Sequence, residues 1–239
     1  MNSAIILAGG LGTRLRSVVS DVPKPMAPVG GRPFLEWQLD HWRDQGIERF
    51  ILSVGYLRSS IISHFGDEYR GSSIEYSIEE APLGTGGGLL HAMHHVQEGS
   101  PFLLLNGDTY FDVEASALLA RHRELDACAT FSLFRAGDTG RYGSIEMDSS
   151  GHIRSFAAGK AEAGQLANGG VYVIEPSAVT ALFTADGAAR SFEGAMLPVL
   201  AASDVCLAGV ECFGRFIDIG VPGDYAAAGE IISASKGQT

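Results

Sequence analysis

Short apolar runs that alternate with amphipathic stretches restrict the fold of this chain more than any other feature. Residues 4–8 (AIILA), 49–54 (RFILSV) and 102–105 (FLLL) are mainly apolar, which is typical of strands buried on both faces of a mainly parallel sheet. Between them, residues 33–45 (PFLEWQLDHWRDQ) carry apolar side chains at helical spacing and end before Gly46. The pattern predicts an α/β domain.

The remaining segments extend this pattern over the whole chain. We predict further strands over residues 74–78, 128–134, 143–147, 152–156 and 170–174, and further helices over 57–65, 86–97, 114–124, 176–183, 192–202 and 222–235. No internal repeat, low-complexity segment or Pro/Ser-rich linker divides the chain. The sequence therefore predicts one domain, residues 1–239, with a mixed, mainly parallel central sheet.

The composition excludes several classes of function. The 239 residues carry a formal net charge of -11, which disfavours binding to nucleic acid but permits a small phosphorylated ligand held by a few cations and Mg²⁺. No apolar stretch reaches the ~18 residues of a membrane span, so we expect no contact with a membrane. Three widely spaced cysteines without a C-x-x-C pair indicate reduced thiols in a cytoplasmic protein.

A glycine-rich loop, residues 7–15 (LAGGLGTRL), follows the first predicted strand directly. Its glycines allow backbone N–H groups to approach phosphate oxygens, the start of a helix adds its positive end, and Arg14 adds a cation. A Walker loop is excluded because no lysine follows the glycines, and Leu15 stands where a dinucleotide-binding turn has its third glycine. We therefore expect this loop to hold the phosphates of a nucleotide.

Lys24 follows in the segment VPKPM, where prolines on both sides keep the chain extended. Together, LAGGLGTRL and KPM resemble the signature of the sugar-1-phosphate nucleotidylyltransferase family. The resemblance covers nearly the whole chain and implies a Rossmann-like fold, with a nucleotide-binding half over residues 1–112 and a sugar-phosphate-binding half over residues 113–239. It implies that the nucleoside triphosphate is held by Leu7, Ala8, Gly9, Gly10, Gly12, Thr13, Arg14 and Lys24.

Two aspartates extend the resemblance to a metal ion. Asp108 follows a buried strand in the segment NGD, and a carboxylate at the carboxyl end of such a strand faces the ligand crevice, where hard oxygens suit Mg²⁺. Asp108 resembles the family's first metal-binding aspartate. Residues 216–222 (FIDIGVP) resemble the family's W-x-D-x-G-T-P segment, with Phe216 for Trp and Val221 for Thr. The resemblance makes Asp218 the second metal ligand.

The choice of base depends on one carboxylate. Residues 82–88 (PLGTGGG) resemble the family's second nucleotide loop, which implies that the base is contacted by Pro82, Gly84 and Thr85. Glu79 precedes this loop, and a carboxylate accepts both adjacent donors of guanine, whereas an amide accepts with only one of its two heads. Glu79 therefore favours GTP. Glu80 is a competing candidate, and a solvated role for either glutamate stays open.

Further matches point to the acceptor sugar. Tyr142-Gly143 and residues 168–172 (NGGVY) resemble sugar-binding segments of the family, and Lys160 resembles a lysine that binds the phosphate of the sugar. The sugar phosphate would contact Asn106, Gly143, Lys160, Asn168 and Gly169. In relatives a glutamate precedes the lysine, whereas Gly159 stands here, with Glu162 as a substitute.

The implied reaction is an in-line attack of the acceptor's phosphate on the α-phosphorus of the nucleoside triphosphate, with release of pyrophosphate. Positioning and charge neutralisation accelerate such a reaction without a protein nucleophile. Arg14 and Lys24 would offset charge on the triphosphate, and Lys160 would hold the attacking phosphate. Asp108 and Asp218 would hold the Mg²⁺ that bridges the two substrates.

Within the family, the chain resembles in particular the bacterial D-glycero-α-D-manno-heptose 1-phosphate guanylyltransferases. This implies transfer of GMP from GTP to the heptose phosphate, giving GDP-heptose for capsule, lipopolysaccharide or other surface polysaccharides, by a homodimer or homotetramer. One alternative is a mannose, glucose or N-acetylmuramate 1-phosphate nucleotidylyltransferase that uses GTP, UTP or dTTP. Alternatives of other classes are a non-catalytic subunit that senses nucleotide sugars and a dinucleotide-binding oxidoreductase.

Overall fold

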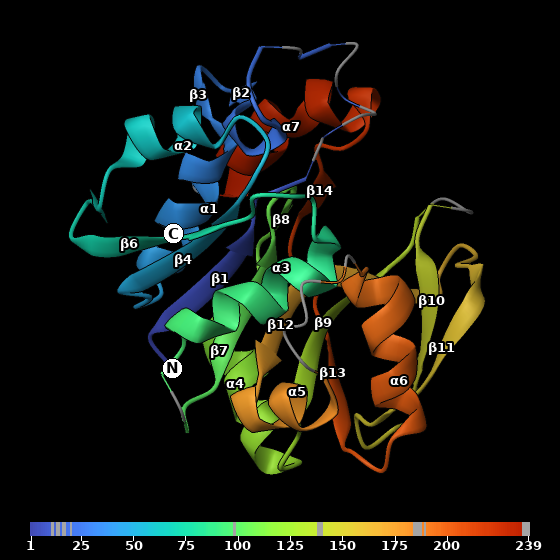
Figure 1. Ribbon diagram of the computed structural model, residues 1–239. Coiled ribbons are helices and arrows are strands. Elements are labelled where there is room, and N and C mark those ends of the chain that lie inside the picture. The colour runs from blue at the N-terminus through green and yellow to red at the C-terminus, as the bar shows by residue number, and fades with distance from the viewer. Residues whose placement is uncertain are drawn as a thin grey trace.

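The computed structural model describes residues 1–10, 12, 15, 18–19, 21–97, 99–137, 141–183, 188 and 190–235, with the side chains of 157–160 and 235 excepted. A ten-stranded mixed sheet forms the centre of this part of the chain, and helices pack on both of its faces (Figure 1). The predicted α/β fold with a mixed central sheet is therefore confirmed.

Parallel strands build the first half of the sheet: β1 Ser3–Leu7, β4 Arg49–Val54, β6 Ser72–Ile78 and β7 Phe102–Asn106. β1 lies between β4 and β7, and the short strand β5, Glu68–Tyr69, pairs antiparallel with β6 at the edge. Side chains of β1 alternate between two core layers, since Ala4 and Ile6 join one apolar cluster and Ile5 joins the other. The sheet is thus covered on both faces, as its apolar strands require.

The second half of the sheet is mainly antiparallel. Strand β12, Leu166–Ile174, joins the two halves because it runs antiparallel both to β7 and to β9, Ala129–Arg135. Strand β13, Leu207–Glu211, then pairs parallel to β9. Strands β10, Gly143–Met147, and β11, Ile153–Lys160, extend the sheet from the beginning of β12.

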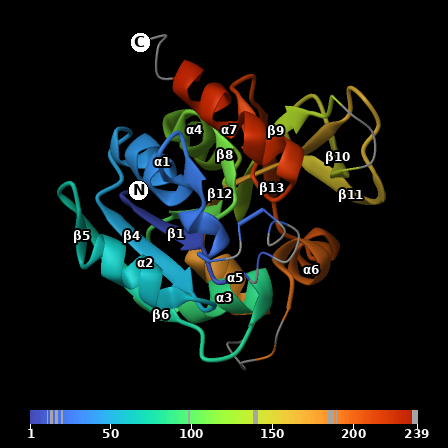
Figure 2. The ribbon, with the colours of Figure 1, turned by 90° about the horizontal axis from the view of Figure 1, so that it is seen from above.

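Helices pack against each face through apolar stripes. Figure 2 shows α1 and α4 on one side of the sheet and α3 and α5 on the other. One face carries α1 Phe34–Arg43, α2 Arg58–Phe65 and α4 Ala115–Glu124, and the other carries α3 Gly84–Ala92, α5 Pro176–Leu182 and α6 Leu197–Ala202. In α1, Leu35, Leu39 and Trp42 are buried on one side at helical spacing. None of the helices in the described part of the chain combines the length and apolar character needed to cross a membrane.

Short elements complete the fold beside the main sheet. Strand β8, Thr109–Phe111, pairs antiparallel with β14, Phe216–Asp218, and β2, Pro28–Val29, pairs with β3, Arg32–Pro33. Helix α7, Pro222–Ser235, packs beside β14 and is tied to β2 because the Tyr225 hydroxyl donates to the Pro28 carbonyl at 2.7 Å. The 3₁₀ turns are η1 Lys24–Met26 and η2 Met93–His95, and a π-helical turn, η3 Phe192–Met196, precedes α6.

Each predicted strand and helix is found, with ends that differ by a few residues. The predicted helix 86–97 begins earlier, at Gly84, and ends in the turn η2, while the predicted helix 192–202 begins as η3. The sequence did not predict β13, β8 and β14, or the short strands β2, β3 and β5. Most of these are two or three residues long, so no apolar alternation marks them.

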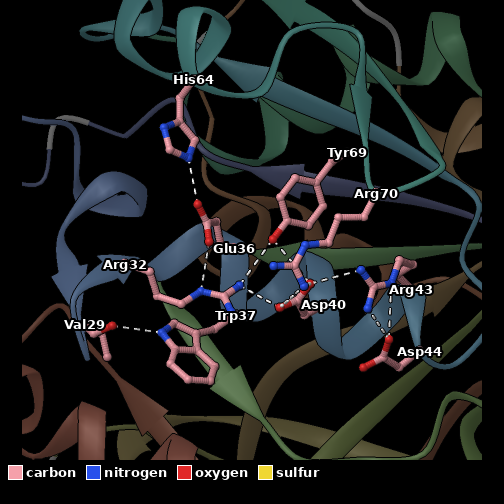
Figure 3. Close-up of polar contacts among 10 residues, drawn as sticks. All are labelled: Val29, Arg32, Glu36, Trp37, Asp40, Arg43, Asp44, His64, Tyr69 and Arg70. Carbon is pink, nitrogen blue, oxygen red and sulfur yellow. Dashed lines mark hydrogen bonds and ion pairs between the residues drawn. The ribbon is translucent and has the colours of Figure 1, made fainter.

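A cluster of charged side chains ties two edges of the fold to α1 (Figure 3). The side chain of Asp40 is 3% exposed and pairs with Arg32 at 2.6 Å, Arg70 at 3.1 Å and Arg43 at 3.3 Å. The Tyr69 hydroxyl also donates to Asp40, and burial together with the charge of Asp40 raises the pKa of Tyr69 to about 12, which keeps this donor protonated. These five residues, the Asp40 cluster, hold the β2–β3 and β5–β6 hairpins against α1.

Candidate active site

A cavity of about 780 Å³ opens where strands β1 and β7 end. Among the predicted site residues, its lining contains Leu7, Ala8, Gly9, Gly10, Gly12, Lys24, Glu79, Pro82, Gly84, Thr85, Asn106, Asp108, Gly143, Asn168 and Asp218. Ligand crevices of α/β sheets lie at the carboxyl ends of parallel strands, and the cavity follows this rule. The sequence motifs, scattered over more than two hundred residues, therefore meet at one place.

Four of the predicted site residues lie outside the cavity lining or outside the described part of the chain. Thr13 and Arg14 are outside the described part of the chain, and Lys160 belongs to β11 but its side chain is likewise not described. Gly169 packs against the ring of Phe111 and is not part of the cavity lining. The neighbouring glycine of the same segment, Gly170, lines the cavity instead.

Lys24 lies between the two predicted metal-binding aspartates. Its Nζ is 2.5 Å from Asp108 Oδ2 and 3.7 Å from Asp218 Oδ1, and its side chain is only 10% exposed. The aspartates meet because β14 pairs with β8, which places Asp218 opposite Thr109, next to Asp108. The Gly220 N–H donates to Asp218 Oδ1 at 2.7 Å and fixes that carboxylate. The fold thus brings one cation and two carboxylates from three distant segments together.

This pair of carboxylates fits a divalent cation. Mg²⁺ prefers oxygen ligands and is commonly held by one or two carboxylates, with water and substrate phosphates completing its shell. Asp108 and Asp218 both direct oxygens toward one ammonium group, which shows that the space between them favours positive charge. No group of three or more metal-binding side chains exists among the described residues, so a metal ion here would depend on its substrates for further ligands.

The Glu79 side chain lies beside the glycine-rich loop, next to Gly9. It is 8% exposed, and its carboxylate accepts hydrogen bonds from the Ser53 hydroxyl at 2.8 Å and from the Leu83 N–H at 3.0 Å. A side chain at Gly9 would place its Cβ 2.5 Å from Glu79 Oε1, and a side chain at Gly88 would place it at 2.8 Å. Glycine is therefore needed at both positions for the carboxylate to lie beside the loop.

The competing candidate, Glu80, lies outside the cavity. Its side chain is 79% exposed and pairs with Arg58 at 3.2 Å, and Glu80 is not part of the cavity lining. Of the two glutamates, only Glu79 borders the cavity.

The second glycine-rich segment begins α3 and packs tightly against the chain near η3. The carbonyl of Arg190 accepts a hydrogen bond from the Gly86 N–H at 2.9 Å, and the Arg190 N–H donates to Leu83 at 2.8 Å. A Cβ at Gly86 would lie 2.6 Å from the sulfur of Met196. Part of the glycine content of this loop is thus explained by close packing, while Pro82, Gly84 and Thr85 face the cavity.

Strand β12 supplies the opposite wall. The Asn168 amide donates to the Tyr172 hydroxyl at 2.7 Å and its oxygen accepts from the Gly170 N–H at 3.0 Å. Gly170 has a φ of +73°, and a Cβ there would lie 3.0 Å from Asn106 Nδ2. Only glycine tolerates both conditions, and the consequence is that Asn106 and Asn168 line one continuous wall.

Phe216, one of the two departures from the family segment that residues 216–222 resemble, belongs to an aromatic group beside this wall. Its ring stacks on Phe134 with centroids 4.2 Å apart and meets Tyr142 edge-on at 5.6 Å. Burial raises the pKa of Tyr142 to about 12. The substitution keeps the packing apolar and leaves Asp218, two residues further on, directed at Lys24.

Two charged residues of the cavity were not predicted. Arg141 lines it and forms a double contact with Asp224 at 2.5 and 3.1 Å, a partner that raises the pKa of Arg141. Glu193 lines it from η3. Arg141 precedes the Y-G motif directly, so the motif pointed to its neighbourhood, whereas no local pattern marks Glu193.

Carboxylates outnumber cations in the described lining of the cavity. The acidic residues are Glu79, Asp108, Glu193 and Asp218, and the basic ones are Lys24 and Arg141. A polyphosphate entering this part of the cavity would meet net negative charge, which a divalent cation would offset.

The sequence pattern of the family described as nucleotidyl transferase matches residues 3–233. The chain belongs to the nucleotidyl transferase family. Two curated relatives of this nucleotidyl transferase are D-glycero-alpha-D-manno-heptose 1-phosphate guanylyltransferases. The protein from Campylobacter jejuni subsp. jejuni is 38% identical over 93% of this chain and 96% of its own length. The protein from Aneurinibacillus thermoaerophilus is 40% identical over 94% of this chain and 96% of its own length.

Solved structures agree with these sequence relatives. Two crystal structures of HddC from Yersinia pseudotuberculosis, one of them complexed with GMP-PN, superpose on this nucleotidyl transferase with TM-scores of 0.83 and 0.82. Both are 35% identical and cover 96% of this chain and 99% of theirs. The predicted family is therefore confirmed.

Proposed function

We propose that this nucleotidyl transferase transfers GMP from GTP to D-glycero-α-D-manno-heptose 1-phosphate, giving GDP-heptose and pyrophosphate. The observation that carries the proposal is the arrangement of Lys24 between Asp108 and Asp218 in a cavity bordered by both glycine-rich segments. Similarity over nearly the full length to two heptose 1-phosphate guanylyltransferases, and to HddC, which is solved with GMP-PN, supports the choice of both substrates.

Charge neutralisation and positioning are the means by which these residues would act. Asp108 and Asp218 would hold Mg²⁺, which would neutralise phosphate charge and orient the two substrates when bound. Lys24, which lies beside both aspartates, would contact the triphosphate. Arg14 and Lys160, predicted to bind the triphosphate and the attacking phosphate, keep these roles as proposals.

Glu79 would recognise guanine. Its carboxylate borders the glycine loop, is protected from solvent and has a fixed orientation, because Ser53 and Leu83 each donate one hydrogen bond to it. Each carboxylate oxygen can accept a further hydrogen bond, so the two adjacent donors of guanine can be paired. A buried site of this kind discriminates strongly against bases that lack those donors.

The acceptor sugar would lie against β12 and the residues around it. Asn106, Gly143 and Asn168 line this wall, and their amide and backbone groups can pair with sugar hydroxyls. The nucleotide would then occupy the half formed by residues 1–112, and the sugar phosphate the half formed by residues 113–239. A cytoplasmic location, an assembly into homodimers or homotetramers and a role in surface polysaccharide synthesis stay predictions of the sequence.

The test is pyrophosphate release by the purified protein with Mg²⁺, one of five nucleoside triphosphates and one sugar 1-phosphate from a panel. We expect release with GTP and the heptose phosphate to exceed that of every other pair. Higher release with mannose 1-phosphate would keep the guanylyltransferase and change the acceptor. No release with any pair would contradict the proposed function.

A matched pair of variants tests the base assignment separately. Glu79→Gln should lower the preference for GTP over UTP and dTTP, since an amide can accept only one of the two guanine donors. Glu80→Gln makes the same chemical change one residue further on, at an exposed side chain outside the cavity, and should leave the preference unchanged. Equal preferences in all three proteins would contradict the role of Glu79.

A further inference from the structure

Glu193 places a carboxylate in the cavity for which none of the predicted roles accounts. It lies in the π-helical turn η3, whose start is fixed because the Ser191 hydroxyl oxygen accepts a hydrogen bond from the Gly194 N–H at 2.9 Å. Its side chain faces the cavity between the second glycine-rich segment and the end of β7.

Both oxygens of Glu193 are held in place by cavity residues. The Thr85 hydroxyl donates to Oε2 at 3.1 Å, and the Asn106 amide donates to Oε1 at 3.4 Å. Thr85 Oγ1 also accepts from the Phe192 N–H at 2.8 Å, which leaves its proton for Glu193. The carboxylate is thus oriented before any ligand arrives, and such preorganisation lowers the cost of binding.

A carboxylate in a cavity for two phosphorylated substrates must face a neutral part of one of them, because it would repel phosphate. A metal-binding role is disfavoured, since Glu193 forms no group of three metal-binding side chains with Asp108 and Asp218. The neutral groups that donate hydrogen bonds are the base and the hydroxyls of the ribose and of the acceptor sugar.

The neighbours of Glu193 favour the acceptor sugar. Its partner Asn106 lies against Gly170 of β12, where a Cβ would come within 3.0 Å of the amide, so this carboxylate borders the wall lined by Asn168. Glu79, in contrast, lies between Gly9 and Gly88 on the side of the glycine loop. The two glutamates therefore serve different regions of the cavity.

We propose that Glu193 is a specificity-determining residue that accepts hydrogen bonds from hydroxyl groups of the acceptor sugar phosphate. Each of its oxygens accepts one hydrogen bond from the protein and retains the capacity for another. The inference rests on the proposed function in that it assigns a residue to the acceptor of that reaction.

Steady-state kinetics with Glu193→Gln test the proposal. We expect the KM for the sugar phosphate to rise by about tenfold to a hundredfold, the usual effect of losing hydrogen bonds to a charged acceptor, while the KM for GTP stays within about twofold. The matched control is Glu124→Gln, an exposed glutamate of α4 outside the cavity lining, which should change neither constant. A rise in the KM for GTP alone, in both constants equally, or in neither would overturn the proposal.

Two further measurements separate this inference from the proposed function. Calorimetric binding of the heptose phosphate to wild type and Glu193→Gln does not depend on turnover, and binding weakened only in the variant supports the inference even if the wild type releases no pyrophosphate. With deoxy analogues of the acceptor, wild type should discriminate against the analogue that lacks the paired hydroxyl, and Glu193→Gln should not. Equal discrimination by both proteins would contradict the contact.

Discussion

The Asp40 cluster and the cavity both bring carboxylates and cationic side chains together. The charges are balanced in the cluster, whereas carboxylates are in excess in the described lining of the cavity. Three arginines surround the buried Asp40, and two of them also pair with Glu36 or Asp44. In the described lining of the cavity, four carboxylates face two cations. A balanced cluster satisfies itself and holds the fold, whereas an unbalanced one retains the capacity to bind a cation or another ligand.

Helix α1 connects these two regions. Asp40 faces the hairpins at the edge of the fold, while Gln38 donates from Nε2 to the carbonyls of Asn106 at 2.8 Å and Thr109 at 2.6 Å. Those two residues flank Asp108, so Gln38 holds the turn that presents this aspartate. The comparison therefore predicts separable effects on stability and activity, with Gln38 affecting both.

Of the four substitutions, Asp108→Asn in the cavity should have the largest effect on activity. We expect kcat to fall by at least about a hundredfold, the usual effect of losing a group that stabilises charge in a transition state. Stability should change by less than about 1 kcal/mol, because the side chain of Asp108 is 35% exposed and Lys24 keeps Asp218 as a partner. Pyrophosphate release and chemical denaturation measure the two quantities. A variant that unfolds readily would refute the contrast between the two regions.

Asp40→Asn should produce the opposite result. Removing the charge leaves three arginines without their shared partner, and breaking a buried ion pair costs about 3 kcal/mol. We expect the free energy of unfolding in urea to fall by about that amount, while kcat of the folded fraction at low temperature stays near that of the wild type. A large loss of kcat with unchanged stability would show that the cluster acts on catalysis.

Gln38→Leu should lower both quantities. It leaves two carbonyls without their donor at a position that is 2% exposed, which costs about 1–3 kcal/mol. Because a displaced catalytic group slows a reaction steeply, we expect kcat to fall by about tenfold and the Mg²⁺ concentration for half-maximal rate to rise. Gln38→Glu serves as the comparison, since it retains the shape and loses the donor. An unchanged Mg²⁺ requirement in both would limit Gln38 to a structural role.

Arg70→Ala should have the smallest effect. Its side chain is 54% exposed, and exposed ion pairs contribute about 0–1 kcal/mol, while Asp40 keeps Arg32 and Arg43. We expect a small decrease in the denaturation midpoint of the variant. Because salt screens the ion pair in the wild type, this difference between the two proteins should become smaller as salt is added. A loss as large as that of Asp40→Asn would place the main contribution of the cluster at its exposed rim.

Local sequence patterns predict most of the elements and the glycine-rich loop. Apolar runs such as residues 102–105, and the motif LAGGLGTRL, can be recognised from a few neighbouring residues. The meeting of Asp108 with Asp218 was expected only from resemblance. It depends on the pairing of β8 with β14, two three-residue strands far apart in the chain. Glu193 and Gln38 were missed for the same reason, because their partners are set by tertiary packing rather than by neighbouring residues.

The central place of β1 has a consequence for synthesis on the ribosome. Its partner on one side, β4, ends at residue 54, whereas its partner on the other side, β7, ends at residue 106. A growing chain can therefore cover one edge of β1 long before the other, and an uncovered apolar strand edge invites pairing with foreign strands. We therefore expect the nascent chain to leave this strand edge unpaired throughout the interval between those two events.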